Sequence, residues 1–243
     1  VPGQWHRPVA AEHAIMCAII GKATRAVSPR VRRPSRLESS MPPLSSSPRS
    51  GHLTRLAVTP EHWLESARQV PSPNHNARPE GEVSALVLHS ISLPPGRFGG
   101  PAIEQLFTNQ LDPGAHPYFA DIHQLRVSAH VLIQRDGRLV QFVPFDRRAW
   151  HAGRSRWHDG QRERVELNDF TIGIELEGDE VHPYRDVQYR TLARTVAGLM
   201  ASYPALTREC ITSHARIAPL RKTDPGPAFD WAYFDRLLDD IQD

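Results

Sequence analysis

Two short apolar segments constrain the fold of this chain most, because each predicts a buried strand that presents one chemically active side chain. Residues 83–88 are apolar except for Ser84, and His89 follows them directly. Residues 172–176 repeat this arrangement with one carboxylate, Glu175. Short apolar runs are typical of buried strands, and α/β folds commonly place ligand-binding groups at strand ends. The two segments therefore predict a sheet that carries functional groups.

Periodicity and turn signals predict the remaining elements. Thr59 and Pro60 form a helix N-cap and first turn, and apolar residues recur at helical spacing up to Val70, so we expect a helix there. The other expected elements are a helix at 103–108, a hairpin of strands 131–133 and 139–143 around Asp136-Gly137, a surface loop at 151–168, a helix at 186–203, a strand at 211–213 and a closing amphipathic helix at 231–238. Together they predict an α/β fold, a single domain with a central mixed β-sheet flanked by helices.

The first 57 residues differ in composition from the rest. They are rich in Arg, Pro and Ser and carry a charge of +7, whereas the remainder carries −5. Such a segment buries too little apolar surface to fold alone. We therefore expect a disordered basic arm at 1–57 and a folded domain at 58–243. A solvated leader is the favoured interpretation of the arm, and a tail that binds nucleic acid or touches a membrane is the alternative. The acidic balance of the domain argues against nucleic-acid binding.

Cysteine content and hydropathy bear on location. Cys17 and Cys210 lie on opposite sides of the arm boundary, so a disulfide framework is not expected and a reducing compartment is the simpler prediction. The apolar run at 14–20 is too short to span a bilayer. These observations predict a cytoplasmic protein without a membrane anchor.

One segment near the C-terminus combines metal-ligand and cationic side chains. His214, Lys222 and Asp224 fall within eleven residues. Zinc takes imidazole nitrogen and carboxylate oxygen as ligands, and a catalytic site uses three protein ligands and keeps one position open for water. The third ligand must come from elsewhere in the chain, and His89 is the candidate.

Several ordered motifs resemble one enzyme family. They are LVLH at 86–89, SLPPG at 92–96, RVSAH at 126–130, RAWHAG at 148–153, NDFTIGIELEG at 168–178 and RKTDPGPAFDW at 221–231. With these motifs, residues 63–238 are similar to the 1,6-anhydro-N-acetylmuramoyl-L-alanine amidases, zinc amidases of type 2 with the peptidoglycan-recognition fold. The resemblance implies that residues 58–243 form a zinc amidase domain. Its implied reaction is cleavage of the amide between the lactyl group of anhydromuramic acid and L-alanine during recycling of wall fragments.

The resemblance also implies residue roles. It makes His89, His214 and Asp224 the ligands of one Zn²⁺ ion, Glu175 the acid/base carboxylate and Lys222 the stabiliser of negative charge on the amide oxygen. The implied substrate is an anhydro-muropeptide, which offers a sugar ring and peptide carboxylates. Candidate substrate-binding residues are Arg126, Trp150 and Arg221.

Four further histidines are not assigned as metal ligands. We expect His130 and His151 to support the site or the structure rather than to act as a fourth ligand, because a fourth ligand would displace the catalytic water. His116 and His123 are interpreted as surface residues. Ser90 stands where better-known family members carry Asn, and about four extra residues lie between 154 and 168.

Two other functions stay open. A non-catalytic muramyl-peptide binding module would be signalled by loss of a ligand, and no ligand is lost. An amidase acting on intact cell-wall peptidoglycan would need export or a wall-binding domain, and the sequence shows neither. We expect a monomer that binds neither nucleic acid nor membrane.

Overall fold

A six-stranded mixed sheet forms the centre of the fold. The structure is a computed structural model that describes residues 53–160 and 162–242. The strand order is β11-β4-β10-β5-β6-β2, and all neighbours are parallel except the β5–β6 pair. The strands are β2 (Arg68–Gln69), β4 (Ala85–Ile91), β5 (Val131–Ile133), β6 (Leu139–Gln141), β10 (Thr171–Glu177) and β11 (Ile211–Ser213). This architecture confirms the predicted fold class.

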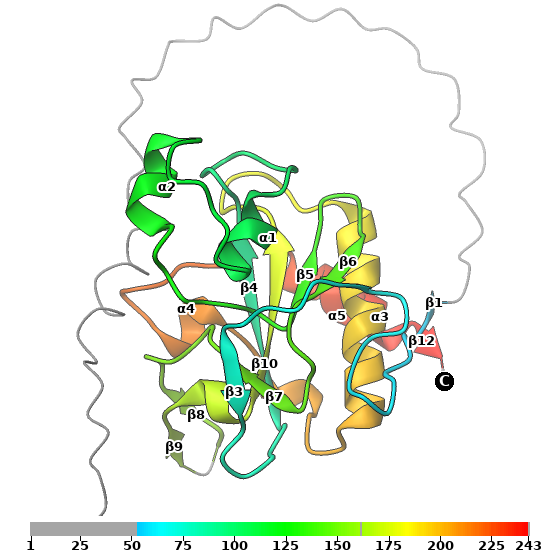
Figure 1. Cartoon of the computed structure of the whole chain (residues 1–243). Helices are drawn as coiled ribbons and strands as arrows, with labels where there is room; N and C mark the ends of the chain where they lie inside the picture. The colour runs from blue at the N-terminus through cyan, green and yellow to red at the C-terminus, as the bar shows by residue number, and fades with distance from the viewer. Residues whose placement is uncertain (1–52, 161, 243) are drawn as a thin grey trace, which may run out of the picture.

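Helices cover both faces of this sheet (Figure 1). On one face, α3 (Asp186–Ser202) and α5 (Trp231–Asp239) bury their apolar residues against the sheet. On the other face, α1 (Ala102–Phe107) and α2 (Pro117–Ile122) form a second apolar cluster with β5 and β6. The short α4 (His214–Ile217) follows β11 directly. The predicted strands, the hairpin, the long helix and the closing helix are all confirmed.

Alternation along the two central strands decides which side chains face α3 and α5 and which face the other side of the sheet. In β4, Leu86 and Leu88 join the cluster under α3 and α5, whereas Ala85, Val87 and Ile91 face the other side. His89 has the same parity as the second group. In β10, Ile172, Ile174 and Leu176 likewise face α3 and α5. Glu175 must therefore face the side that His89 faces, because side chains alternate along a strand.

The helix predicted from Thr59 to Val70 is wrong. This segment forms a tight loop with an isolated β-bridge between Val58 and Leu64, and His62 adopts a left-handed φ of 66°. The backbone N–H of buried Leu64 donates to Oε1 of Gln141 over 2.7 Å. The backbone N–H groups of Leu64 and Val70 thus donate to Gln141 of β6 and not to helical partners, and the local N-cap signal is overridden by tertiary contacts.

The folded region begins before residue 58. β1 (Leu53–Thr54) pairs in parallel with β12 (Ile241–Gln242), and Leu56 is buried. A Cβ added to Gly198 of α3 would lie 2.0 Å from the carbonyl oxygen of Leu56, so this helix position accommodates only glycine. The predicted arm therefore overlaps the fold at residues 53–57, and its remainder, 1–52, lies outside the described residues.

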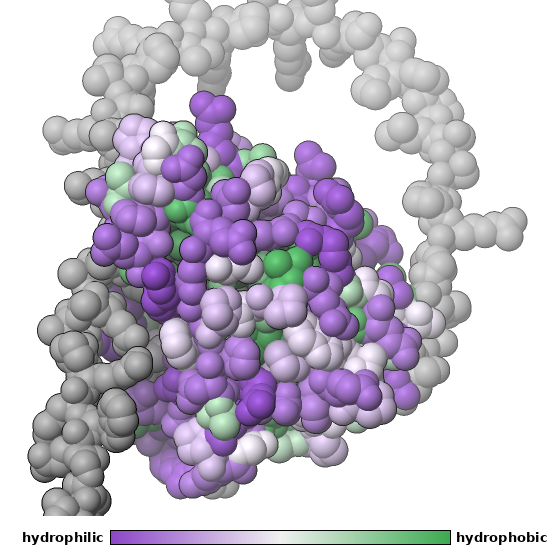
Figure 2. All heavy atoms as spheres, in the orientation of Figure 1, coloured by the Kyte–Doolittle hydropathy of each residue, from purple (hydrophilic) through white to green (hydrophobic). Residues whose placement is uncertain are grey.

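Smaller elements complete the structure. The segment 151–168, predicted as a surface loop, contains a two-stranded hairpin and the buried residues Leu167 and Asn168. The other elements are β3 (His75–Ala77) paired with β7 (Arg147–Ala149), β8 (Trp157–His158) paired with β9 (Glu163–Arg164), and the 3₁₀ turns Leu167–Asp169 and Arg208–Cys210. On the face drawn in Figure 2, hydrophilic side chains predominate and apolar patches are small.

Candidate active site and metal centre

Three buried side chains converge at one end of the parallel strands. His89 lies on β4, His214 opens α4, and Asp224 lies in the loop that follows α4. β11 pairs with β4 so that Ser213 stands beside Leu88, which brings the two histidines side by side. The backbone N–H of Ala215 donates to the carbonyl of Asp224 over 3.0 Å and holds the loop against α4.

The donor atoms of this cluster fit a metal ion. Nδ1 of His89 lies 2.9 Å from Nδ1 of His214 and 3.2 Å from Oδ2 of Asp224, and the His214–Asp224 distance is 3.1 Å. Ligands at tetrahedral zinc are separated by roughly 3.3 Å when each bond is about 2.0 Å. Each of the three side chains is about 2% exposed. Oδ1 of Asp224 and Nε2 of His214 are buried without a hydrogen-bond partner among the described residues.

Charge states in the cluster also suit a cation. Burial lowers the pKa of His214 to about 4, so its imidazole is neutral at pH 7. Burial alone would raise the pKa of Asp224, but His214 and His89 outweigh that effect and hold this pKa well below its ordinary value. A neutral His214 beside an ionised Asp224 matches the protonation states that zinc requires of such ligands.

Glu175 and Lys222 stand beside this cluster. Glu175 is the partner of His89 in the β4–β10 register, and its side chain is almost fully buried. Burial, reinforced by Asp224 and opposed by His89 and Lys222, raises the pKa of Glu175 to about 7. Oε2 of Glu175 has no hydrogen-bond partner among the described residues. A buried carboxyl group whose pKa lies near neutrality suits proton transfer.

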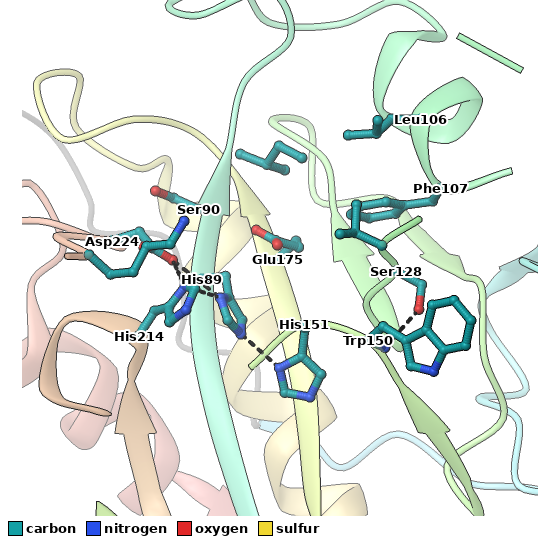
Figure 3. A pocket seen from close by; sticks show the side chains of 13 residues that line it. His89, Ser90, Leu106, Phe107, Ser128, Trp150, His151, Glu175, His214 and Asp224 are labelled. Carbon is teal, nitrogen blue, oxygen red and sulfur yellow. Dashed lines mark hydrogen bonds and ion pairs between the residues drawn. The ribbon is translucent and has the colours of Figure 1, made fainter. Parts of the chain in front are cut away.

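A single pocket contains the cluster and an apolar wall. Figure 3 shows the histidines and Asp224 apart from the apolar side chains Leu106 and Phe107, with Glu175 drawn between the two groups. The wall comes from α1, which rests on the same face of the sheet. The lining residues are His89, Ser90, Ile91, Leu106, Phe107, Val127, Ser128, Trp150, His151, Glu175, His214, Lys222 and Asp224.

Comparison with known proteins identifies the family. The model of the N-acetylmuramoyl-L-alanine amidase family matches residues 79–227, which include every residue of the polar cluster. The chain belongs to this amidase family. It is 57% identical to the 1,6-anhydro-N-acetylmuramyl-L-alanine amidase AmpD of Citrobacter freundii over 73% of this chain and 93% of that protein. The same amidase of Escherichia coli K12 is 57% identical over 72% of this chain and 94% of that protein.

A solved structure supports the same assignment. A crystal structure of an AmpD derivative matches with a TM-score of 0.69 and 57% identity, and the match covers 73% of this chain and 97% of the other. The resemblance drawn from the sequence motifs is thereby confirmed. Within residues 53–160 and 162–242, no helix of the amidase combines the length and apolar character needed to cross a bilayer.

Of the three candidate substrate-binding residues, Trp150 lines the pocket and the two arginines do not. Trp150 lines the pocket, where its Nε1 donates to Oδ1 of Asn76 over 2.7 Å. Arg126 is exposed and does not line the pocket; its Nη1 donates to the carbonyls of Gln124 and Leu125. Arg221 is half-buried, donates to the carbonyl of Arg154 and does not line the pocket either.

The sequence did not single out the apolar wall. Leu106 and Phe107 lie on the predicted helix, but helical spacing marks them only as buried. Ser128 accepts the backbone N–H of Trp150 over 3.1 Å and fixes this part of the pocket rim. Leu106 and Phe107 belong to the site because of the way α1 packs on the sheet, and residue spacing does not encode that packing.

His130 supports the sheet from within. Its Nδ1 accepts the backbone N–H of Gly173 over 3.0 Å, so its Nε2–H donates to the carbonyl of Arg147, also over 3.0 Å. Arg78 places its guanidinium 3.1 Å from Nε2. Burial and then this positive charge hold the pKa of His130 well below its ordinary value. His130 is therefore a neutral structural residue, 0% exposed.

This burial predicts a specific loss of stability in acid. The unfolded chain protonates His130 below about pH 6.5, whereas the folded chain keeps it neutral. Its contribution is fully present above that pH and is lost as the pH falls, by about 1.4 kcal/mol per pH unit for one proton. Urea unfolding with a chelator present should show a steeper decline from pH 7 to 5.5 for the wild type than for His130→Gln. Equal slopes would contradict this account.

Proposed function

We propose that this amidase is a zinc enzyme that hydrolyses the amide between the lactyl group of 1,6-anhydro-N-acetylmuramic acid and L-alanine of the stem peptide, in cytoplasmic recycling of peptidoglycan. The observation that carries the proposal is the convergence of three buried ligand atoms beside a carboxyl group with a raised pKa. His89, His214 and Asp224 would hold one zinc ion. The relatives named as anhydromuramyl amidases support the choice of substrate.

The zinc ion and Glu175 would have distinct roles in amide hydrolysis. A bound zinc ion would supply Lewis-acid activation, polarising the amide carbonyl and lowering the pKa of water. Glu175, with one carboxylate oxygen unpartnered, takes a proton from the attacking water as general base. It then returns a proton to the departing alanine nitrogen, which would otherwise leave as a poor anionic leaving group. The raised pKa suits both halves of this exchange.

Lys222 stabilises the negative charge that develops on the amide oxygen. It lines the pocket and is 5% exposed, so water screens its ammonium group weakly. Lys222 and Asp224 are two residues apart, which lets one loop supply both the ligand and the cation. In Lys222→Met we expect kcat to fall about 100-fold to 1000-fold while zinc content is unchanged. Steady-state kinetics beside metal analysis test this, and an unchanged kcat would remove Lys222 from the reaction.

The pocket walls suit the sugar, and the arginines suit the peptide. The ring of Trp150 and the apolar residues Leu106 and Phe107 offer a surface for a pyranose ring. Arg126 and Arg221 lie outside the pocket lining, so we propose that they meet carboxylates of the stem peptide beyond it.

Product analysis separates this function from its alternatives. We expect mass spectrometry to show free stem peptide released from anhydro-muropeptides and much less from intact sacculi. Preferential release from sacculi would favour the amidase of intact wall. Binding of anhydro-muropeptide without any product, by protein that contains zinc, would favour the binding module.

A further inference from the structure

A continuous hydrogen-bond chain runs from the back of His89 into the protein. Nε2 of His89 lies 3.0 Å from Nδ1 of His151. Nε2 of His151 lies 3.2 Å from Oγ1 of Thr171, and that hydroxyl lies 2.7 Å from the carbonyl oxygen of Leu167. His89, His151, Thr171 and Leu167 are all buried. Figure 3 shows the first link of the chain, between the two imidazole rings.

The last member of the chain fixes the direction of every bond. A backbone carbonyl can only accept, so the single hydroxyl proton of Thr171 donates to Leu167. The Thr171 oxygen then accepts from Nε2–H of His151. With that proton on Nε2, a neutral His151 presents Nδ1 as an acceptor, and His89 must donate its own Nε2–H to it. A charged His151 is disfavoured, because no carboxylate hydrogen-bonds with it among the described residues.

We propose that His151 and Thr171 are positioning residues that lock His89 in the Nε2–H tautomer, so that its Nδ1 lone pair is aimed into the metal centre. This inference rests on the proposed zinc site. It goes further because it attributes the tautomer of His89 to the hydroxyl of Thr171, which lies two hydrogen bonds away. Thr171 is itself neither a member of the metal-binding cluster nor a residue that lines the pocket.

The surroundings hold the His151 ring in the orientation that the relay requires. A Cβ added to Gly173 would lie 2.6 Å from Nδ1 and Cγ of His151, so the glycine provides the space that the ring fills. The ring meets His89 edge-on, with centroids 5.1 Å apart and planes at 89°. The backbone N–H of His151 donates to Oδ1 of Asn168 over 3.1 Å. The backbone and the ring of His151 are thus both fixed.

Removing the Thr171 hydroxyl breaks the relay without altering a ligand. Thr171→Val keeps the shape of the side chain but leaves Nε2–H of His151 without its acceptor, which favours the opposite tautomer of both histidines. We expect zinc affinity to fall about 10-fold to 100-fold, the usual effect of losing a group that orients a metal ligand. Thr171→Ser restores the hydroxyl and should restore most of the affinity.

Thr195→Val provides a matched control. Thr195 is a fully buried threonine on α3 whose hydroxyl also donates to a backbone carbonyl, that of Thr191, over 2.8 Å. It lies on the opposite side of the sheet from the metal centre. The substitution removes the same chemical group at a remote place, and zinc affinity should stay at the wild-type value.

Two measurements on the full chain test the proposal. Competition with a chromogenic chelator gives the zinc affinity of the wild type, Thr171→Val, Thr171→Ser and Thr195→Val. Long-range ¹H–¹⁵N NMR of the metal-free wild type gives the tautomer of His89 without any substitution. Wild-type affinity in a folded Thr171→Val, or an Nδ1–H tautomer of His89, would overturn the relay. If the wild type binds no zinc, the zinc proposal fails instead, and the NMR spectrum still decides the tautomer.

Discussion

Asp224→Ala is expected to abolish both zinc binding and turnover. The carboxylate is the only anionic ligand in the cluster, and its Oδ2 lies within 3.2 Å of Nδ1 of both histidines. Two neutral imidazoles retain zinc weakly, and amide hydrolysis at neutral pH depends on metal activation of water and carbonyl. We expect zinc content near zero after dialysis and kcat/KM lower by at least about 1000-fold. Metal analysis and a product assay on the same sample measure the two effects.

The control for this variant is an aspartate away from the site. Asp235 is exposed on α5, and Asp235→Ala should keep both zinc and activity. Chelator treatment of the wild type should reproduce the loss seen in Asp224→Ala, and added zinc should rescue only the wild type. Full activity of the wild type after thorough zinc removal would contradict the zinc proposal.

Glu175→Gln is expected to keep zinc and lose most of the activity. The amide has nearly the shape of the carboxyl group but cannot take up a proton from water. General acid–base groups contribute roughly 100-fold to 10,000-fold, so kcat should fall by that factor. Because Glu175 is not one of the clustered ligands, the zinc content of the variant should equal that of the wild type.

Together these two variants separate ligand from base. Loss of zinc in Glu175→Gln would make Glu175 a ligand, and retained activity would require another base in the pocket. His151 is the alternative candidate for the general base, since it also lines the pocket. Its Nδ1 already contacts His89, so it has no free acceptor for a proton from water.

The sequence predicted the strands and the meeting of His89, His214 and Asp224 better than it predicted the surroundings of that cluster. Runs such as 83–88 are strongly apolar, and the metal-ligand types of His89, His214 and Asp224 are specific enough to suggest a zinc centre. The assignment of Glu175 and Lys222 depended on the family resemblance. Periodicity alone does not give the register of β4 and β10, and only that register places Glu175 beside His89.

The failures have a common physical origin in tertiary contacts. The helix predicted after Thr59 does not form, and the backbone N–H of Leu64 instead donates to Oε1 of Gln141, a residue 77 positions away. The relay behind His89 joins His151, Thr171 and Leu167, and no local pattern marks a hydroxyl as part of a metal site. Sequence patterns report which residues are buried, whereas function here also depends on which buried residues meet.

The pairing of β4 with β10 restricts where this enzyme tolerates insertions and deletions. Residues along both strands alternate between the helix-covered side and the pocket, and His89 and Glu175 are direct neighbours in the ladder. One residue inserted within either strand would turn every side chain after it to the opposite side. The pocket can therefore be remodelled by lengthening or shortening the loops around it, whereas these two strands tolerate replacement of residues but no change in their number.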